Sequence, residues 1–243
     1  MRLRDFKALT FDCYGTLIDW ESGLLAALES LTARSKLPRS RQEILEAYAA
    51  HEVAQEHYTP TLKYSQLLAV VYKRLAENWQ TPAAWNECVA FGQSIREWPA
   101  FSDSPAALQY LKRHYKLFVL SNVDNESFSH SNRKLAVQFD GIMTAEDIGS
   151  YKPSPRNFRY LLERLESQGI RKEQVLHVAQ SLFHDHKPAN ELGLASCWIN
   201  RQHAQPGFGA TASPGALPHY DFTFNSMAEL AEAHAKEVGG AAR

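Results

Sequence analysis

Short apolar runs alternate with longer helical patterns along this chain, and the alternation restricts the fold more than any other feature of the sequence. The runs are rich in β-branched and aromatic residues, which are typical of buried strands. Strands that alternate with helices favour a parallel sheet built from strand–helix–strand units. We therefore predict an α/β protein with strands over residues 7–12, 116–121, 141–145, 174–179, 196–200 and 222–224.

A long insertion separates the first two predicted strands. About a hundred residues lie between them, far more than a crossover between neighbouring strands needs. The insertion has helical periodicity, with Leu24, Leu28 and Leu31 on one face of a helix. We expect a Rossmann-like, doubly wound core of residues 1–17 and 100–243, and an inserted helical cap of residues 18–99.

Charge and composition exclude several classes of protein. The formal net charge is −1 and the basic residues are scattered, so we expect no nucleic-acid partner. No apolar run is long enough to span a bilayer and the first residues lack the apolar core of a secretory signal, so we expect no membrane partner. The three cysteines are scattered and show no metal-ligand spacing. These features predict a cytoplasmic protein.

Polar side chains stand at or just after the ends of four predicted strands. Asp12 ends the first strand, Ser121 and Asn122 end the second, Lys152 follows the third and Asp185 follows the fourth. In a doubly wound sheet the carboxyl ends of the strands meet at one edge, where ligands bind. We therefore expect these side chains to converge on one site.

With this set of residues the chain resembles the haloacid dehalogenase superfamily and, within it, the (S)-2-haloacid dehalogenases. The resemblance covers the core and includes the place and size of the cap. It rests on Asp12-Cys13-Tyr14-Gly15-Thr16, Ser121-Asn122, Lys152-Pro153 and His184-Asp185. It implies an aspartate nucleophile beneath a cap.

Two positions separate the possible reactions. Phosphatases of this superfamily have a second aspartate where Tyr14 stands and a magnesium-binding aspartate where Gln180 stands. Magnesium prefers anionic oxygen ligands, whereas a halide leaves as a stable anion without a metal or a general acid. The residues favour dehalogenation with no metal or other cofactor. A magnesium-dependent phosphatase of small phosphate esters and a non-catalytic protein of the same fold remain the alternatives.

The resemblance implies a role for each of the side chains that carry it. Asp12 attacks C2 of a small 2-haloalkanoic acid and forms an ester, and Asp185 directs the water that hydrolyses this ester to a 2-hydroxy acid. Lys152 keeps Asp12 ionised. Hydrogen bonds to the nucleophile, the substrate carboxylate and the departing halide are assigned to Thr16, Ser121 and Asn122.

The substrate-binding half of the site departs from the family pattern. Dehalogenases of this branch typically have an arginine early in the cap, but here no arginine lies between Arg41 and Arg74, and we place His51 near that position. His184 beside the second aspartate raises the hypothesis of fluoroacetate as a substrate. The cap leucines favour a homodimer. The residues expected to contact the substrate are Tyr14, Trp20, His51, Ser181 and His184.

Overall fold

The computed structural model describes residues 1–203, 210, 211 and 213–240. Its sheet has six parallel strands in the order β3-β2-β1-β4-β5-β6. The strands are β1 (Ala8–Phe11), β2 (Lys116–Ser121), β3 (Gly141–Thr144), β4 (Val175–Ala179), β5 (Ala195–Ile199) and β6 (Phe222–Phe224). The order reverses between β1 and β4, the position where open α/β sheets bind ligands. The predicted doubly wound fold is confirmed.

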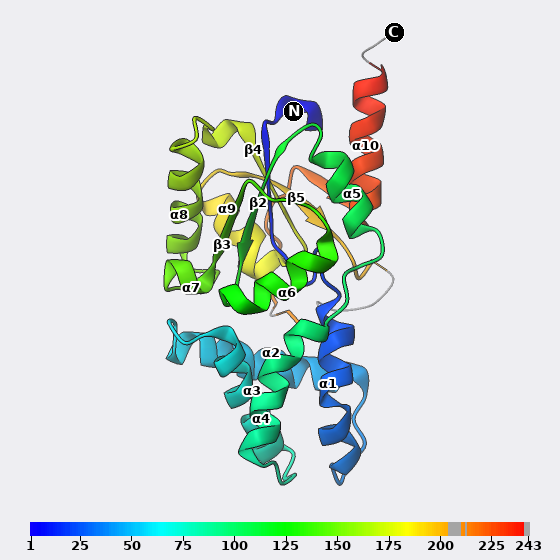
Figure 1. Cartoon of the computed structure of the whole chain (residues 1–243), viewed down its shortest axis with the longest axis vertical. Helices are drawn as coiled ribbons and strands as arrows, with labels where there is room; N and C mark the ends of the chain where they lie inside the picture. Colours follow the sequence, from blue (N-terminus) through cyan, green and yellow to red (C-terminus); the bar gives the residue numbers. More distant parts are fainter. Residues whose placement is uncertain (204–209, 212, 241–243) are drawn as a thin grey trace.

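Helices cover both faces of the sheet (Figure 1). Alternate residues of β2 point to opposite faces, so that Leu117 and Val119 join one apolar cluster while Phe118 and Leu120 join the other. The first cluster includes residues of α5 (Ser104–Leu111), α6 (Asn125–Leu135) and α10 (Met227–Gly240). The second includes residues of α7 (Ala145–Ile148), α8 (Pro155–Glu166) and α9 (Lys187–Glu191).

The inserted segment is helical and lies below the carboxyl ends of the strands in Figure 1. It contains α1 (Trp20–Arg34), α2 (Arg41–Tyr58), α3 (Tyr64–Asn78), α4 (Trp85–Gln93) and the 3₁₀ turn η2 (Ser94–Glu97). An isolated bridge joins Ile18 to Ala100, so the chain leaves and re-enters the core at adjacent points. Among the described residues, no helix combines the length and the apolar character that crossing a membrane requires.

Polar contacts fasten the far end of the cap to the core. Lys63 forms an ion pair with Glu146 at 2.8 Å. The Ser65 backbone N–H donates to Asp124 Oδ2 at 2.8 Å, and the Tyr151 hydroxyl donates to the Leu62 carbonyl. These contacts, together with the two chain connections at Ile18 and Ala100, hold the cap over the edge of the sheet where β1 and β4 end.

Candidate active site

Asp12 follows β1 and its carboxylate is held from two sides. Thr16 Oγ1 donates to Oδ2 at 2.6 Å, and Lys152 Nζ donates to Oδ1 at 2.9 Å. The tight turn between Asp12 and Thr16 requires a glycine, because Gly15 has φ +93° and an added Cβ would approach Gln180 Oε1 to 3.0 Å. The turn thus fixes the orientation of a carboxylate at the switch point of the sheet.

Lys152 is the cation of the site and is 1% exposed. Its ammonium group donates to Asp12 Oδ1, to the Leu120 carbonyl at 3.0 Å and to Asp185 Oδ1 at 2.6 Å. Burial opposes the charge, but the two carboxylates raise the pKa of Lys152 above its usual value. The lysine is therefore charged, and its three N–H groups are all engaged.

Asp185 is completely buried and is oriented through one oxygen. Oδ1 accepts from Lys152 and lies 2.9 Å from His177 Nε2, while His177 Nδ1 lies 2.8 Å from Thr10 Oγ1. Burial opposes ionisation of Asp185, yet Lys152 and His177 hold the pKa of its carboxyl well below the usual range. An ionised carboxylate only accepts, so His177 Nε2 carries the proton. Asp185 Oδ2 has no hydrogen-bond partner among the described residues.

The two aspartates differ in charge preference although they share one lysine. Burial raises the pKa of Asp12, the charge of Asp185 adds to this effect, and Lys152 and Thr16 oppose it. Asp12 is therefore the carboxylate that takes up a proton first as the pH falls.

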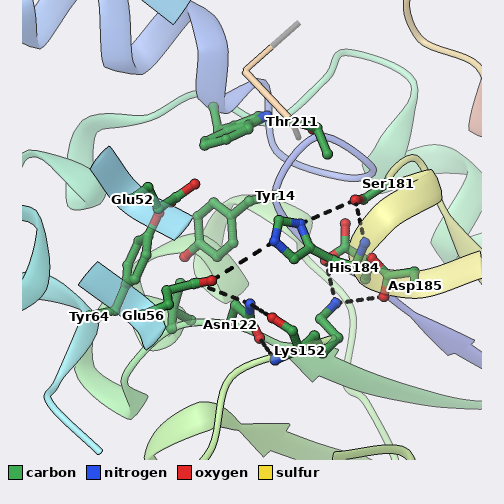
Figure 2. Close-up of a pocket in the computed structure, with 13 residues that line it drawn as sticks. Tyr14, Glu52, Glu56, Tyr64, Asn122, Lys152, Ser181, His184, Asp185 and Thr211 are labelled. Atoms are coloured by element: carbon green, nitrogen blue, oxygen red, sulfur yellow. Dashed lines mark hydrogen bonds and ion pairs between the residues drawn. The ribbon is translucent and has the colours of Figure 1, made fainter. Parts of the chain in front are cut away.

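A small cavity lies between these groups and the cap (Figure 2). Its volume is about 50 Å³, and a single water needs roughly 10–15 Å³ by this kind of measure. Thr16 and Ser121 are buried outside its lining. The structure brings the other predicted residues except His51 to its wall, and these are Asp12, Tyr14, Trp20, Asn122, Lys152, Ser181, His184 and Asp185.

The placement of His51 is wrong. His51 lies on the cap helix α2, where Nε2 is 3.4 Å from Asn78 Nδ2, and it does not line the cavity. Successive residues of a helix point about 100° apart, and the neighbouring Glu52 occupies the inward direction. The sequence alone did not fix the rotation of α2 about its axis.

The expected role of Asn122 also needs correction. Its amide Nδ2 donates to the Lys152 carbonyl at 3.0 Å and to Glu56 Oε1 at 3.1 Å. Both amide hydrogens are therefore engaged and neither points freely at a departing halide. Its Oδ1 accepts from the Lys152 backbone N–H at 2.7 Å, so Asn122 positions the lysine segment. Ser121 Oγ is buried and has no partner among the described residues.

Three functional-site residues escaped the sequence analysis. His177 is the one polar member of the strand Val175–Ala179, and a histidine inside an otherwise apolar strand was the available signal. Glu52 and Glu56 are spaced i, i+4 on α2, which places them on one face of that helix. Both glutamates line the cavity from the cap side.

His184 lines the cavity opposite the cap glutamates. Its Nδ1 lies 3.2 Å from Ser181 Oγ, and its Nε2 is buried, has no hydrogen-bond partner among the described residues and lies 3.9 Å from Glu56 Oε2. Burial lowers the pKa of His184 to about 4, so the ring is neutral at physiological pH. Ser181 also accepts from the His184 backbone N–H at 3.0 Å, which fixes the ring at the cavity wall.

The polar side chains around Asp12 are paired with one another. Both Asp12 oxygens already accept hydrogen bonds, and Gln180 Oε1 accepts from Thr211 Oγ1 at 3.3 Å. The Tyr14 hydroxyl is paired with Ser131 Oγ at 2.8 Å. In the described part of the chain, no three His, Cys, Asp or Glu side chains come together as a metal cluster.

A doubly wound sheet, a cap and a buried aspartate held by lysine define a class of hydrolase. The sequence model of the "haloacid dehalogenase-like hydrolase" family matches residues 6–183. The chain belongs to this family.

Named relatives align with most of the chain. It is 26% identical to (S)-2-haloacid dehalogenase 4A of Burkholderia cepacia, with 97% of this chain and 98% of that protein aligned. It is 27% identical to the (S)-2-haloacid dehalogenase of a Pseudomonas species (strain YL), over 80% and 83% of the two chains. The L-2-haloacid dehalogenase of Xanthobacter autotrophicus with covalently bound chloropropionic acid shares the fold, with a TM-score of 0.75, 16% identity and coverage of 93% and 97%.

Proposed function

We propose that the protein hydrolyses the carbon–halogen bond of small 2-haloalkanoic acids through an ester on Asp12. The observation that carries the proposal is the pairing of Asp12, fixed by Lys152 and Thr16, with the unpartnered Oδ2 of buried Asp185 at one cavity. The (S)-2-haloacid dehalogenases among the relatives support the substrate class. The cavity volume of about 50 Å³ supports a substrate of only a few heavy atoms.

In the first step, an Asp12 carboxylate oxygen attacks C2 from the side opposite the halogen. The new C–O bond replaces the carbon–halogen bond, and the bonding electron pair leaves with the halide, which inverts C2. Lys152 favours the ionised nucleophile by its charge, and the Thr16 hydroxyl fixes the direction of the carboxylate. The leaving halide needs neither a proton nor a metal.

In the second step, water attacks the ester carbonyl carbon of Asp12. Asp185 Oδ2 accepts a proton from that water, while Lys152 and His177 hold Oδ1. The acyl C–O bond of the ester then breaks, and the departing 2-hydroxy acid takes the proton from Asp185 and keeps an oxygen that came from Asp12. The water oxygen stays on Asp12, whose carboxyl loses its proton to solvent. His177 is thus a positioning residue for Asp185.

Halide release from chloroacetate, fluoroacetate and both enantiomers of 2-chloropropanoate, each in excess EDTA, tests the proposal. We expect release from at least one of these acids, with no loss on chelation, because each step uses only side chains of this chain. Ion chromatography measures the halide. The absence of release from every acid, together with magnesium-dependent hydrolysis of a phosphate ester such as glyceraldehyde 3-phosphate, would contradict the proposal. Fluoride release is the test of the fluoroacetate hypothesis.

Two expectations from the sequence stay predictions. The cytoplasmic location rests on the composition and the homodimer on the cap leucines, and sedimentation velocity would test the homodimer.

A further inference from the structure

The cap presents acidic groups to the cavity where related dehalogenases are expected to present an arginine. Glu52 and Glu56 lie one helical turn apart on α2, and they are only 4% and 7% exposed. No arginine lines the cavity in the described part of the chain, and Lys152 has no free N–H group. The wall therefore offers carboxyl groups, not cations, to whatever faces the cap.

One oxygen of each glutamate is held and the other is left open. Glu52 Oε1 accepts from the hydroxyls of Tyr48, at 2.9 Å, and Tyr64, and Glu56 Oε1 accepts from Asn122 at 3.1 Å. Among the described residues, neither Oε2 receives a hydrogen bond, and Nε2 of the neutral His184 ring lies 3.9 Å from Glu56 Oε2. Figure 2 shows both carboxylates directed at the space in front of Tyr14 and His184.

Aromatic rings share this wall with the acids. Trp20, Tyr14 and Tyr64 line the same cavity as Glu52 and Glu56. Aromatic faces attract cations, and ammonium ligands are recognised by pockets that combine such rings with carboxylates. An anionic or halogen end placed here would meet two acids and no donor cation, so the wall selects against it.

We propose that Glu52 and Glu56 bind a protonated amine on the substrate, so that the preferred substrate is a small 2-haloacid with an ammonium group at the end facing the cap. This inference rests on the proposed reaction at Asp12, which places C2 beside the core and leaves the rest of the substrate toward the cap. The ammonium group donates to the two open Oε2 atoms. The substrate carboxylate then lies on the core side, away from the glutamates.

The charge state of the two glutamates makes the binding of a cation depend on pH. Burial raises the pKa of Glu52 to about 7, and burial together with the charge of Glu52 raises the pKa of Glu56 well above its usual value. A bound cation favours the ionised glutamates, so its binding releases protons and strengthens as the pH rises. The other titratable groups near these acids include Tyr14, Tyr48, Tyr64, Tyr151, His184, Lys152, Asp12 and Asp185.

The test compares two acids of the same shape. In 3-amino-2-chloropropanoate an ammonium group stands where 2-chlorobutanoate has a methyl group, so the ratio of their kcat/KM values isolates the charge. We expect a ratio of at least about ten in favour of the amine, and a ratio that increases from about pH 6 to about pH 8. Glu52→Gln and Glu56→Gln preserve the shape and each lower the ratio about tenfold. Glu46→Gln, an exposed change on the same helix, leaves it unchanged.

A ratio near or below one in the wild type, or a ratio that both glutamine variants leave intact, overturns the inference. Calorimetry of the binding of the same two acids to the Asp12→Asn protein tests the ammonium subsite independently of the proposed reaction. Tighter binding of the amine that Glu56→Gln abolishes supports the subsite even if no chloride is ever released. Equal binding of the two acids rejects the subsite whether or not chloride is released.

Discussion

Replacement of Asp12 by asparagine is expected to reduce halide release by at least about 10⁴-fold, because a neutral amide cannot displace a halide from C2. The substitution barely changes the side-chain shape, and Lys152 keeps its contacts with Asp185 and the Leu120 carbonyl. The loss should therefore appear in kcat and not in the fold. Halide release by ion chromatography measures the activity, and circular dichroism measures the fold.

Asp5→Asn is the matched control for this experiment, since Asp5 is an exposed aspartate far from the cavity whose ion pair with Arg2 is at the surface. It should behave like the wild type. An Asp12→Asn enzyme that keeps more than about one hundredth of the wild-type rate would rule out attack by Asp12 as the main route.

Replacement of Lys152 by methionine is expected to destabilise the protein strongly as well as to abolish activity. Methionine fills much of the same space, but it leaves Asp12 and Asp185 buried without a cation. Breaking a buried ion pair on one side costs about 3–5 kcal/mol. Urea unfolding at pH 7 measures the loss, and Lys36→Met, at an exposed lysine, is the control.

The destabilisation caused by Lys152→Met should depend on pH, and the pKa shifts of the two aspartates predict the direction. In the wild type the pKa of Asp185 is held below that of the unfolded chain, so its contribution to stability is present at neutral pH and is lost as the pH falls. Without Lys152, burial raises the pKa of the Asp12 and Asp185 carboxyls above their values in the unfolded chain. Their protonation as the pH falls therefore reduces the destabilisation of the variant. The difference in the free energy of unfolding between the wild type and Lys152→Met should therefore become smaller toward pH 5. An equally stable variant at pH 7 would show that Lys152 is not the compensating charge.

The sheet and the core side of the candidate site were predictable from local sequence. Each strand is a short run of residues, and the carboxyl ends of parallel strands meet at one edge of the sheet. Once the strands were placed, Asp12, Lys152 and Asp185 had to converge, and the structure joins them through two short contacts of Lys152. The predicted strand bounds differ from the observed ones by at most one residue at each end.

The cap side was not predictable in the same way. The residue of α2 that faces the cavity depends on how that helix rotates against the core, and tertiary contacts such as the one between Asn122 and Glu56 set that rotation. A shift of one residue was enough to select His51 in place of Glu52. Occupied hydrogen-bond capacity, as at Asn122, is likewise a property of the packed chain, because its partners come from distant segments.

A single turnover in ¹⁸O-labelled water tests the central claim most directly. With enzyme in excess over a haloacid that it dechlorinates, the ester route predicts an unlabelled 2-hydroxy acid, because the product takes its oxygen from Asp12. Mass spectrometry of the peptide that contains Asp12 should then show one incorporated ¹⁸O. A labelled product and an unlabelled Asp12 would instead show that water attacks C2 directly, and the account of this site would be wrong.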